Sequence, residues 1–73
     1  MSTFSNRLKN LRTNKNIMQK EMAKYLELAT LSYQRYEYGE REPSFDKLIK
    51  LCDYFDVSVD YILGRTDKPE INK

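Results

Sequence analysis

Residues 19–44 read QKEMAKYLELATLSYQRYEYGEREPS, and this stretch decides the fold. Its apolar residues recur at helical spacing in two short segments, residues 19–26 and about 30–38, which we expect to be helices. Gly39 suits the end of the second helix because glycine tolerates a positive φ. Only about three residues separate the two segments, so the helices must cross sharply.

The rest of the chain is also helical in its periodicity. Phe4, Leu8 and Leu11 recur at i, i+4 and i+7 and predict a first helix over about 3–14. Ser44 can cap a helix over about 45–55, and Ser58 can cap a short one that runs through Leu63. The apolar stripe of helix 45–55 is expected to face the core and consists of Phe45, Leu48, Ile49, Cys52 and Phe55.

These segments together predict an all-α fold. A chain of 73 residues is long enough for one small domain. We place the domain at residues 1–64, and residues 65–73 form a polar tail that we expect to be flexible. A sharply crossing helix pair is the geometry of a helix-turn-helix, although structural bundles also contain short helix pairs.

Composition argues against an enzyme. The chain has no histidine, one cysteine and two glycines, so a Ser/His/Asp triad, a zinc site and a phosphate-binding loop all lack residues. We therefore expect no catalytic residue, no metal and no cofactor. Cys52 lies in an apolar stripe and is interpreted as a small core residue. No apolar run is long enough to span a membrane and no signal peptide is visible, which predicts a cytoplasmic protein with no membrane partner.

Charge is unevenly distributed along the chain. Residues 1–41 hold eight Lys/Arg against four Glu, whereas residues 42–73 hold five Lys/Arg against seven Asp/Glu. A basic amino-terminal half indicates a polyanionic partner that meets one face of the domain.

Four groups of residues in this order resemble a known family. They are Gln19 with Glu21 and Ala23, Tyr36-Glu37-x-Gly39, Arg41-x-Pro43-Ser44, and Val57-Ser58-Val59-Asp60-Tyr61-x-Leu63-Gly64. From about residue 8 to residue 64 the chain is similar to the XRE family of Cro and phage-repressor-type helix-turn-helix transcriptional regulators. The resemblance implies a compact five-helix lambda-repressor-like domain that places its third helix in the major groove of double-stranded DNA, usually as a dimer.

Helical spacing divides the third helix into two faces, and the resemblance implies which of them meets DNA. Ser32, Tyr33, Tyr36 and Glu37 would face the domain, and the family pattern pairs Glu37 with Arg12 as a structural ion pair. The residues expected to contact bases are Thr30, Leu31, Gln34 and Arg35. Those expected to contact phosphates are Gln19, Tyr38 and Arg41.

Several positions depart from the family pattern. Glu27 stands where the turn commonly has glycine, and Met18 and Ala29 stand where the family often has Ser or Thr as helix caps. In the fifth helix we expect Val59 and Ile62 in the core and Tyr61 at a dimer contact.

Two functions are compatible with these features. One is a sequence-specific transcriptional regulator, expected to be a repressor that binds a palindromic operator as a homodimer. The other is a protein-interaction module of the same fold, an antitoxin or anti-repressor that acts through the fourth and fifth helices. A regulatory protein partner fits either function.

Overall fold

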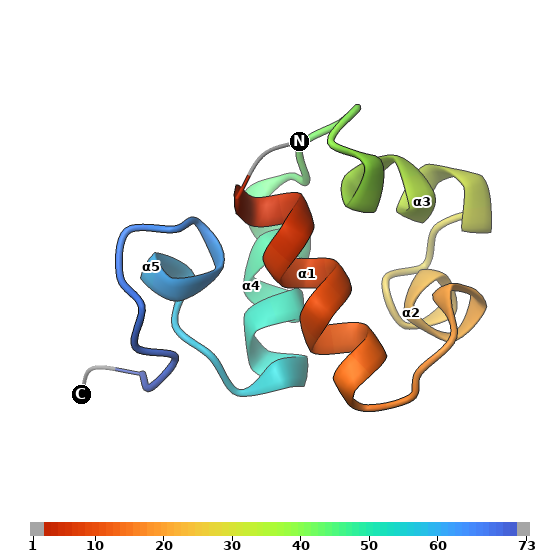
Figure 1. The fold of residues 1–73 in the computed structure, drawn as a ribbon. Helices are drawn as coiled ribbons and strands as arrows, with labels where there is room; N and C mark the ends of the chain where they lie inside the picture. The colour runs from red at the N-terminus through yellow and green to blue at the C-terminus, as the bar shows by residue number, and fades with distance from the viewer. Residues whose placement is uncertain (1–2, 72–73) are drawn as a thin grey trace.

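The structure, a computed structural model, describes residues 3–71 and contains five helices in this range with no strand (Figure 1). The helices are α1 (Thr3–Asn14), α2 (Gln19–Tyr25), α3 (Thr30–Tyr38), α4 (Phe45–Phe55) and α5 (Val59–Ile62). The all-α prediction is therefore confirmed. Helices α2 and α5 each end one residue before the predicted bound, because Leu26 and Leu63 are the residues that follow the last helical turn.

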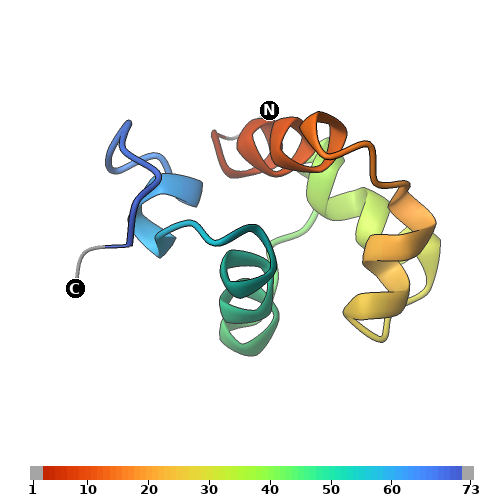
Figure 2. The ribbon, with the colours of Figure 1, turned by 90° about the horizontal axis from the view of Figure 1, so that it is seen from below.

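Helix α1 lies across the middle of the molecule. It packs against α3 on one side and α5 on the other, while α2 packs against α3 and α4 against α5. Figures 1 and 2 show the α2–α3 pair and α5 at opposite ends of the domain, with α1 and α4 between them. The Cα radius of gyration is 11.3 Å, close to the value of about 11 Å expected for a folded chain of this length.

A single apolar cluster holds these helices together. Its buried residues come from all five helices and two loops: Phe4, Leu8, Met22, Ala23, Leu26, Tyr33, Tyr36, Leu48, Leu51, Cys52, Phe55, Val57 and Ile62. Tyr33 and Tyr36 both belong to the cluster, and their rings meet edge to face with centroids 6.2 Å apart. The domain-facing side of α3 is therefore the side that the sequence predicted.

The predicted core stripe of α4 is wrong at two positions. Phe45 is 83% exposed and Ile49 is 52% exposed, whereas Leu51 is fully buried. The buried residues of α4 are spaced at i, i+3, i+4 and i+7, starting from Leu48, so the inward face is rotated toward Leu51. Val59 was also expected in the core and is 38% exposed, whereas Ile62 is buried as expected.

The turn between α2 and α3 keeps a left-handed residue, although Glu27 stands where the family commonly has glycine. Glu27 adopts a φ of 58°, a left-handed conformation that glycine adopts more easily. Met18 and Ala29 precede α2 and α3 without any side-chain cap hydrogen bond. In contrast, Ser44 and Ser58 accept backbone N–H bonds at the starts of α4 and α5. The α2–α3 pair therefore depends on packing more than α4 and α5 do.

Arg7 of α1 connects the first helix to the end of the chain. One guanidinium nitrogen donates to the carbonyls of Tyr61 and Thr66, and the other donates to Asp67 at 2.9 Å. The same guanidinium lies 4.2 Å from the ring centroid of Tyr61. We call these contacts the Arg7 clasp. The first residues after residue 64 thus contact α1. The domain boundary at residue 64 and the flexibility of the tail stay predictions.

Candidate nucleic-acid interface

One face of α3 is free of the core and open to solvent. Thr30, Leu31, Arg35 and Tyr38 are all exposed, and Leu31 is 61% exposed although it is apolar. The other side of the helix is closed by Tyr33, Tyr36 and Glu37, which are buried. Four of the residues expected at DNA therefore lie on a surface that no part of the described chain covers.

Beneath this face, Arg12 and Glu37 form the ion pair that the resemblance implied. The Nε of Arg12 donates to Glu37 Oε2 at 2.5 Å, and Nη2 donates to Oε1 at 3.0 Å, a two-point contact. A further Arg12 nitrogen donates to the carbonyl of Ile17 at 2.8 Å. The pair thus joins α1 both to α3 and to the loop before α2.

The Glu37 carboxylate accepts two more hydrogen bonds. Tyr33 Oη donates to Oε2 at 2.5 Å, and Gln19 Nε2 donates to Oε1 at 3.1 Å. Burial alone would raise the pKa of Glu37, but the bonds from Arg12, Tyr33 and Gln19 lower it below its usual value. Burial and the bond to Glu37 raise the pKa of Tyr33, and the bond to Glu37 raises that of Arg12. At neutral pH, Glu37 is therefore an ionised acceptor.

The Gln34 side chain is less exposed than the sequence indicated, and it is already hydrogen-bonded within the protein. It is half-buried, and its Nε2 donates to Gln19 Oε1 at 3.0 Å. Gln19, expected at a phosphate, therefore bridges the buried carboxylate and an expected base reader. Nothing in the sequence pattern signals this bridge, because it depends on how α2 and α3 cross.

Arg41 and Tyr38 lie at the far end of α3, where the chain leaves the helix. Both are exposed, and Gly39 between them adopts a φ of 76°, so the chain turns away from the helix there. Arg41 also lines a hollow with Phe45 and Leu63. Both side chains are thus open to a ligand that approaches the end of α3.

A lysine of α4 supports the turn between α2 and α3. Lys47 of α4 donates from Nζ to the carbonyl of Leu26 at 2.5 Å, at the carboxyl end of α2. A cation is favourable at that end of a helix. Lysine spacing in the sequence carries no sign of this contact, because the two residues are 21 positions apart.

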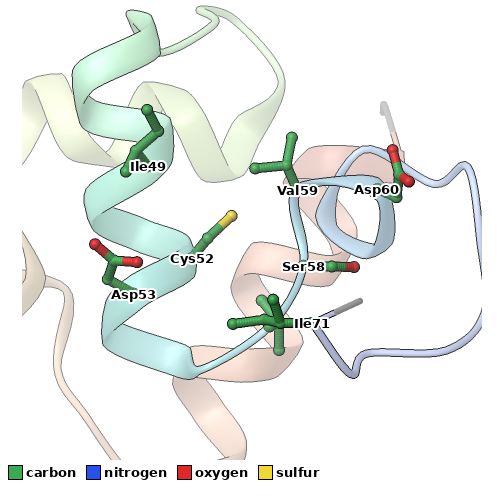
Figure 3. A pocket seen from close by; sticks show the side chains of 8 residues that line it. Ile49, Cys52, Asp53, Ser58, Val59, Asp60 and Ile71 are labelled. Atoms are coloured by element: carbon green, nitrogen blue, oxygen red, sulfur yellow. The ribbon is translucent and has the colours of Figure 1, made fainter. Parts of the chain in front are cut away.

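An apolar surface lies on α4 and α5, away from α2. Its exposed residues are Phe45, Ile49, Val59 and Leu63, which we call the α4–α5 face. Figure 3 shows a hollow lined by two residues of this face, Ile49 and Val59, where Cys52 points from α4 toward the segment that carries Ser58 and Val59. Burial raises the pKa of the Cys52 thiol, with a smaller contribution from Asp53, which fits a core residue.

Tyr61, expected at a dimer contact, lies next to this face. It is half-buried against the core, and its ring is covered on one side by Arg7. Its part in a dimer stays a prediction.

Within residues 3–71, no group of three or more His, Cys, Asp or Glu residues is placed to hold a metal ion. None of the helices in the described range has the length and apolarity needed to cross a lipid bilayer.

Known proteins of similar sequence are regulators. A helix-turn-helix family model matches residues 8–62. YobD of Bacillus subtilis (strain 168), an uncharacterized HTH-type transcriptional regulator, is 40% identical over 67 residues, which cover 92% of this chain and 60% of YobD. The cryptic phage CTXphi transcriptional repressor RstR of Vibrio cholerae is 37% identical over 59 residues, which cover 81% of this chain and 53% of RstR. The chain thus spans a little over half the length of these relatives.

Solved structures of similar fold point the same way. A transcriptional regulator from Listeria innocua superposes with a TM-score of 0.81 at 27% identity, over 96% of this chain and 61% of that one. The P22 c2 repressor, solved in complex with a synthetic operator, superposes with a TM-score of 0.76 at 25% identity, over 82% of this chain and 91% of that one. These relatives are regulators and not enzymes. The chain belongs to the XRE-type helix-turn-helix family, and its fold is that of the phage repressors.

Proposed function

We propose that this chain binds double-stranded DNA in a sequence-specific way and represses transcription at a palindromic operator. The observation that carries this proposal is the two-sided α3, with Tyr33, Tyr36 and Glu37 buried and Thr30, Leu31 and Arg35 open to solvent. A helix held this firmly on one side can enter the major groove with the other side. The operator complex of the P22 c2 repressor, a relative in fold, supports the same reading.

The base readers and phosphate contacts have separate chemistry. Thr30 can bond a base edge, Leu31 can touch a thymine methyl group, and Arg35 can donate two bonds to guanine. Arg41 and Tyr38 can bond phosphates beyond the end of α3, where they fix the position of the protein without reading sequence.

A selection of bound fragments from a random DNA pool tests the proposal. We expect a palindrome to emerge, and Arg35→Ala should then relax preference at one base position of each half-site by roughly 5- to 150-fold. Arg41→Ala should weaken all sequences alike. Lys68→Ala is the matched control, because it removes one positive charge from an exposed residue after α5. Equal, uniform effects of Arg35→Ala and Lys68→Ala would show that α3 does not read bases.

We propose that two copies associate through the α4–α5 face. Phe45 protrudes with 83% of its surface exposed, next to a hollow lined by Phe4, Leu48 and Leu63, so one patch offers both a ring and a space for a ring. A two-fold contact needs such self-complementarity. Tyr61 would lie at the edge of this contact.

Sedimentation of the purified protein tests this contact. Burying a phenylalanine contributes about 1.5–3 kcal/mol per copy, so Phe45→Gln should raise the dimer dissociation constant about 100-fold or more. Met18→Gln is the control, since Met18 is an apolar side chain exposed before α2. Dimers that persist unchanged in Phe45→Gln would exclude this face.

The same apolar surface favours one second function, a protein-interaction module that binds another protein through α4 and α5. Salt separates the two functions, because affinity for DNA through several phosphates falls steeply with added salt. An apolar protein contact depends little on salt.

A further inference from the structure

We infer that Lys47 and Tyr25 set which spacing of the two operator half-sites this protein accepts, by fixing the angle between α4 and the α2–α3 pair. The inference rests on the proposed function, because it takes α3 as the reading helix and the α4–α5 face as the dimer contact. It is carried by two hydrogen bonds that join α2 to α4, which we call the α2–α4 seam.

The α2–α4 seam consists of bonds that cross between the two helices in opposite directions. Lys47 Nζ donates at 2.5 Å to the carbonyl of Leu26, at the carboxyl end of α2. Tyr25 Oη donates at 3.0 Å to the carbonyl of Lys50, and its ring lies against that of Tyr54 with centroids 4.8 Å apart. Because both acceptors are backbone carbonyls, the seam fixes the helices themselves and not only a pair of side chains.

The seam lies on the side of α4 that is turned away from the α4–α5 face. Lys47, Lys50 and Tyr54 are spaced at i, i+3 and i+7, so they share one side of the helix. Phe45 and Ile49, which are exposed, share another. At 3.6 residues per turn, the centres of the two groups are about 150° apart around the helix axis. Helix α4 therefore stands between α2 on one side and the proposed second copy on the other.

The α2–α3 pair is held to the rest of the domain in two ways. One is the apolar cluster, in which α1 packs against α3 and also against α5. Apolar attraction has no direction, and packed helices can slide past one another in small shear motions. The other is the seam, whose hydrogen bonds weaken when their length or angle changes. The cluster thus holds the pair in place, and the seam fixes its tilt relative to α4.

This tilt determines how far apart the two copies of α3 lie on DNA. Moving one half-site by one base pair shifts it by about 3.4 Å and turns it by about 35° around the DNA axis. If the two copies share the turn equally, each α3 must rotate by about 17° relative to its own α4. At about 10 Å from the pivot, the usual separation of packed helices, this rotation moves an atom by about 3 Å. Seam bonds of 2.5 and 3.0 Å do not survive such a displacement.

Two substitutions weaken the seam without a large change in volume. Lys47→Met removes the charged donor, and Tyr25→Phe removes one hydroxyl and keeps the ring. A hydrogen bond from a charged group changes an equilibrium by about 10- to 150-fold, and we expect the lower end for Lys47, which is half-buried. The preference for the selected spacing over a spacing one base pair longer should therefore fall about 10-fold in Lys47→Met. It should fall a few-fold in Tyr25→Phe and persist in Lys47→Arg, which keeps a charged donor.

The readout is the ratio of dissociation constants for two operators with identical half-sites. One operator has the spacing found by selection, and the other has one base pair inserted between the half-sites. Lys50→Met is the matched control, because it removes the same charge from an exposed side chain of α4 and leaves the carbonyl to which Tyr25 donates. A loss of fold or of positive charge changes both constants together and leaves their ratio unchanged.

NMR of the protein without DNA provides a second test. Residual dipolar couplings report the directions of N–H bonds, so those of α3 and α4 should fit one common alignment in the wild type. In the double variant Lys47→Met with Tyr25→Phe, the two helices should require separate alignments.

The possible failures of the inference and of the proposed function are distinguishable. The inference alone is overturned if the wild type prefers one spacing and the double variant keeps the same ratio, if Lys50→Met lowers the ratio equally, or if the double variant keeps a common alignment. A wild type that binds the same half-sites equally well at both spacings overturns the dimer contact and the inference together. A wild type without any sequence preference overturns the proposed function and with it the inference.

Discussion

Replacing Arg12 with methionine should strongly destabilise the domain. The substitution leaves Glu37, which is 1% exposed, as a buried carboxylate without its counterion. Tyr33 and Gln19 still donate to it, but Arg12 contributes the two-point contact of 2.5 and 3.0 Å. The side chain of Arg12 is itself only 11% exposed, so water cannot easily take its place.

The size of the effect follows from burial. Removing one partner of a buried ion pair costs about 3–5 kcal/mol, whereas a domain of 73 residues has a total stability of about 4–11 kcal/mol. The melting temperature should therefore fall by on the order of 12–40 °C. Urea unfolding followed by circular dichroism measures the loss, and Arg35→Met is the control, since Arg35 is an exposed arginine on α3.

The dependence of stability on pH gives a sharper test. The pKa of Glu37 is lowered in the folded wild type, so its ionised carboxylate stabilises the fold at neutral pH. This stabilisation is lost as pH falls below about 4.3, the usual pKa of a glutamate, toward the folded pKa. Without Arg12, burial should raise the folded pKa of Glu37 above its usual value. The loss of stability in Arg12→Met should then grow as pH rises from the usual pKa of glutamate to the raised folded pKa, and it should disappear toward pH 4.

These opposite slopes make the reasoning refutable. Between pH 4 and 7 the stability of Arg12→Met should fall as pH rises, whereas Arg12→Met combined with Glu37→Gln should show no such fall. An Arg12→Met protein within 1 kcal/mol of the wild type at pH 7, or one whose stability rises with pH over this range, would mean that the ion pair does not hold α1 to α3.

Two further changes test local backbone features. Glu27→Gly should raise the free energy of unfolding by about 1 kcal/mol, because a φ of 58° costs glycine less than glutamate; a decrease in urea unfolding would contradict this. Ser44→Ala should lower the free energy of unfolding by about 0.5–2 kcal/mol, because it removes the bond from the Lys47 N–H to Ser44 Oγ, which is 3.3 Å long. Ser44→Asp keeps an acceptor and should restore the stability. A Ser44→Ala protein as stable as the wild type would show that this cap contributes nothing.

Much of the fold could be predicted because its signals are local. The bounds of α3 and α4 agree with prediction, since Gly39 ends one helix and Ser44 caps the other, and both residues act on neighbours in sequence. The two faces of α3 also follow from its own 3.6-residue period. The Arg12–Glu37 pair is not local, and only the family resemblance indicated it.

The remaining features depend on how the helices pack against one another, and the hydrophobic period of a single helix cannot show this. Phe45 has the spacing of a core residue on α4, but the buried residues of this helix begin only at Leu48, so Phe45 stays exposed. Gln19 and Gln34 lie 15 positions apart, and their bond exists only because of the angle between α2 and α3. The same is true of Arg7, whose partners follow it by 54 to 60 positions.

The Arg7 clasp also has a consequence for the order of folding. Helices α2 and α3 can meet early because few residues separate them, whereas the clasp must close a loop of 54 residues or more at an entropic cost of about 3.5 kcal/mol before it gains any contact. We therefore expect the clasp to form after the transition state. Arg7→Met should therefore speed unfolding and leave the refolding rate almost unchanged. We expect α5 to be the last helix to pack during folding and the first to detach during unfolding.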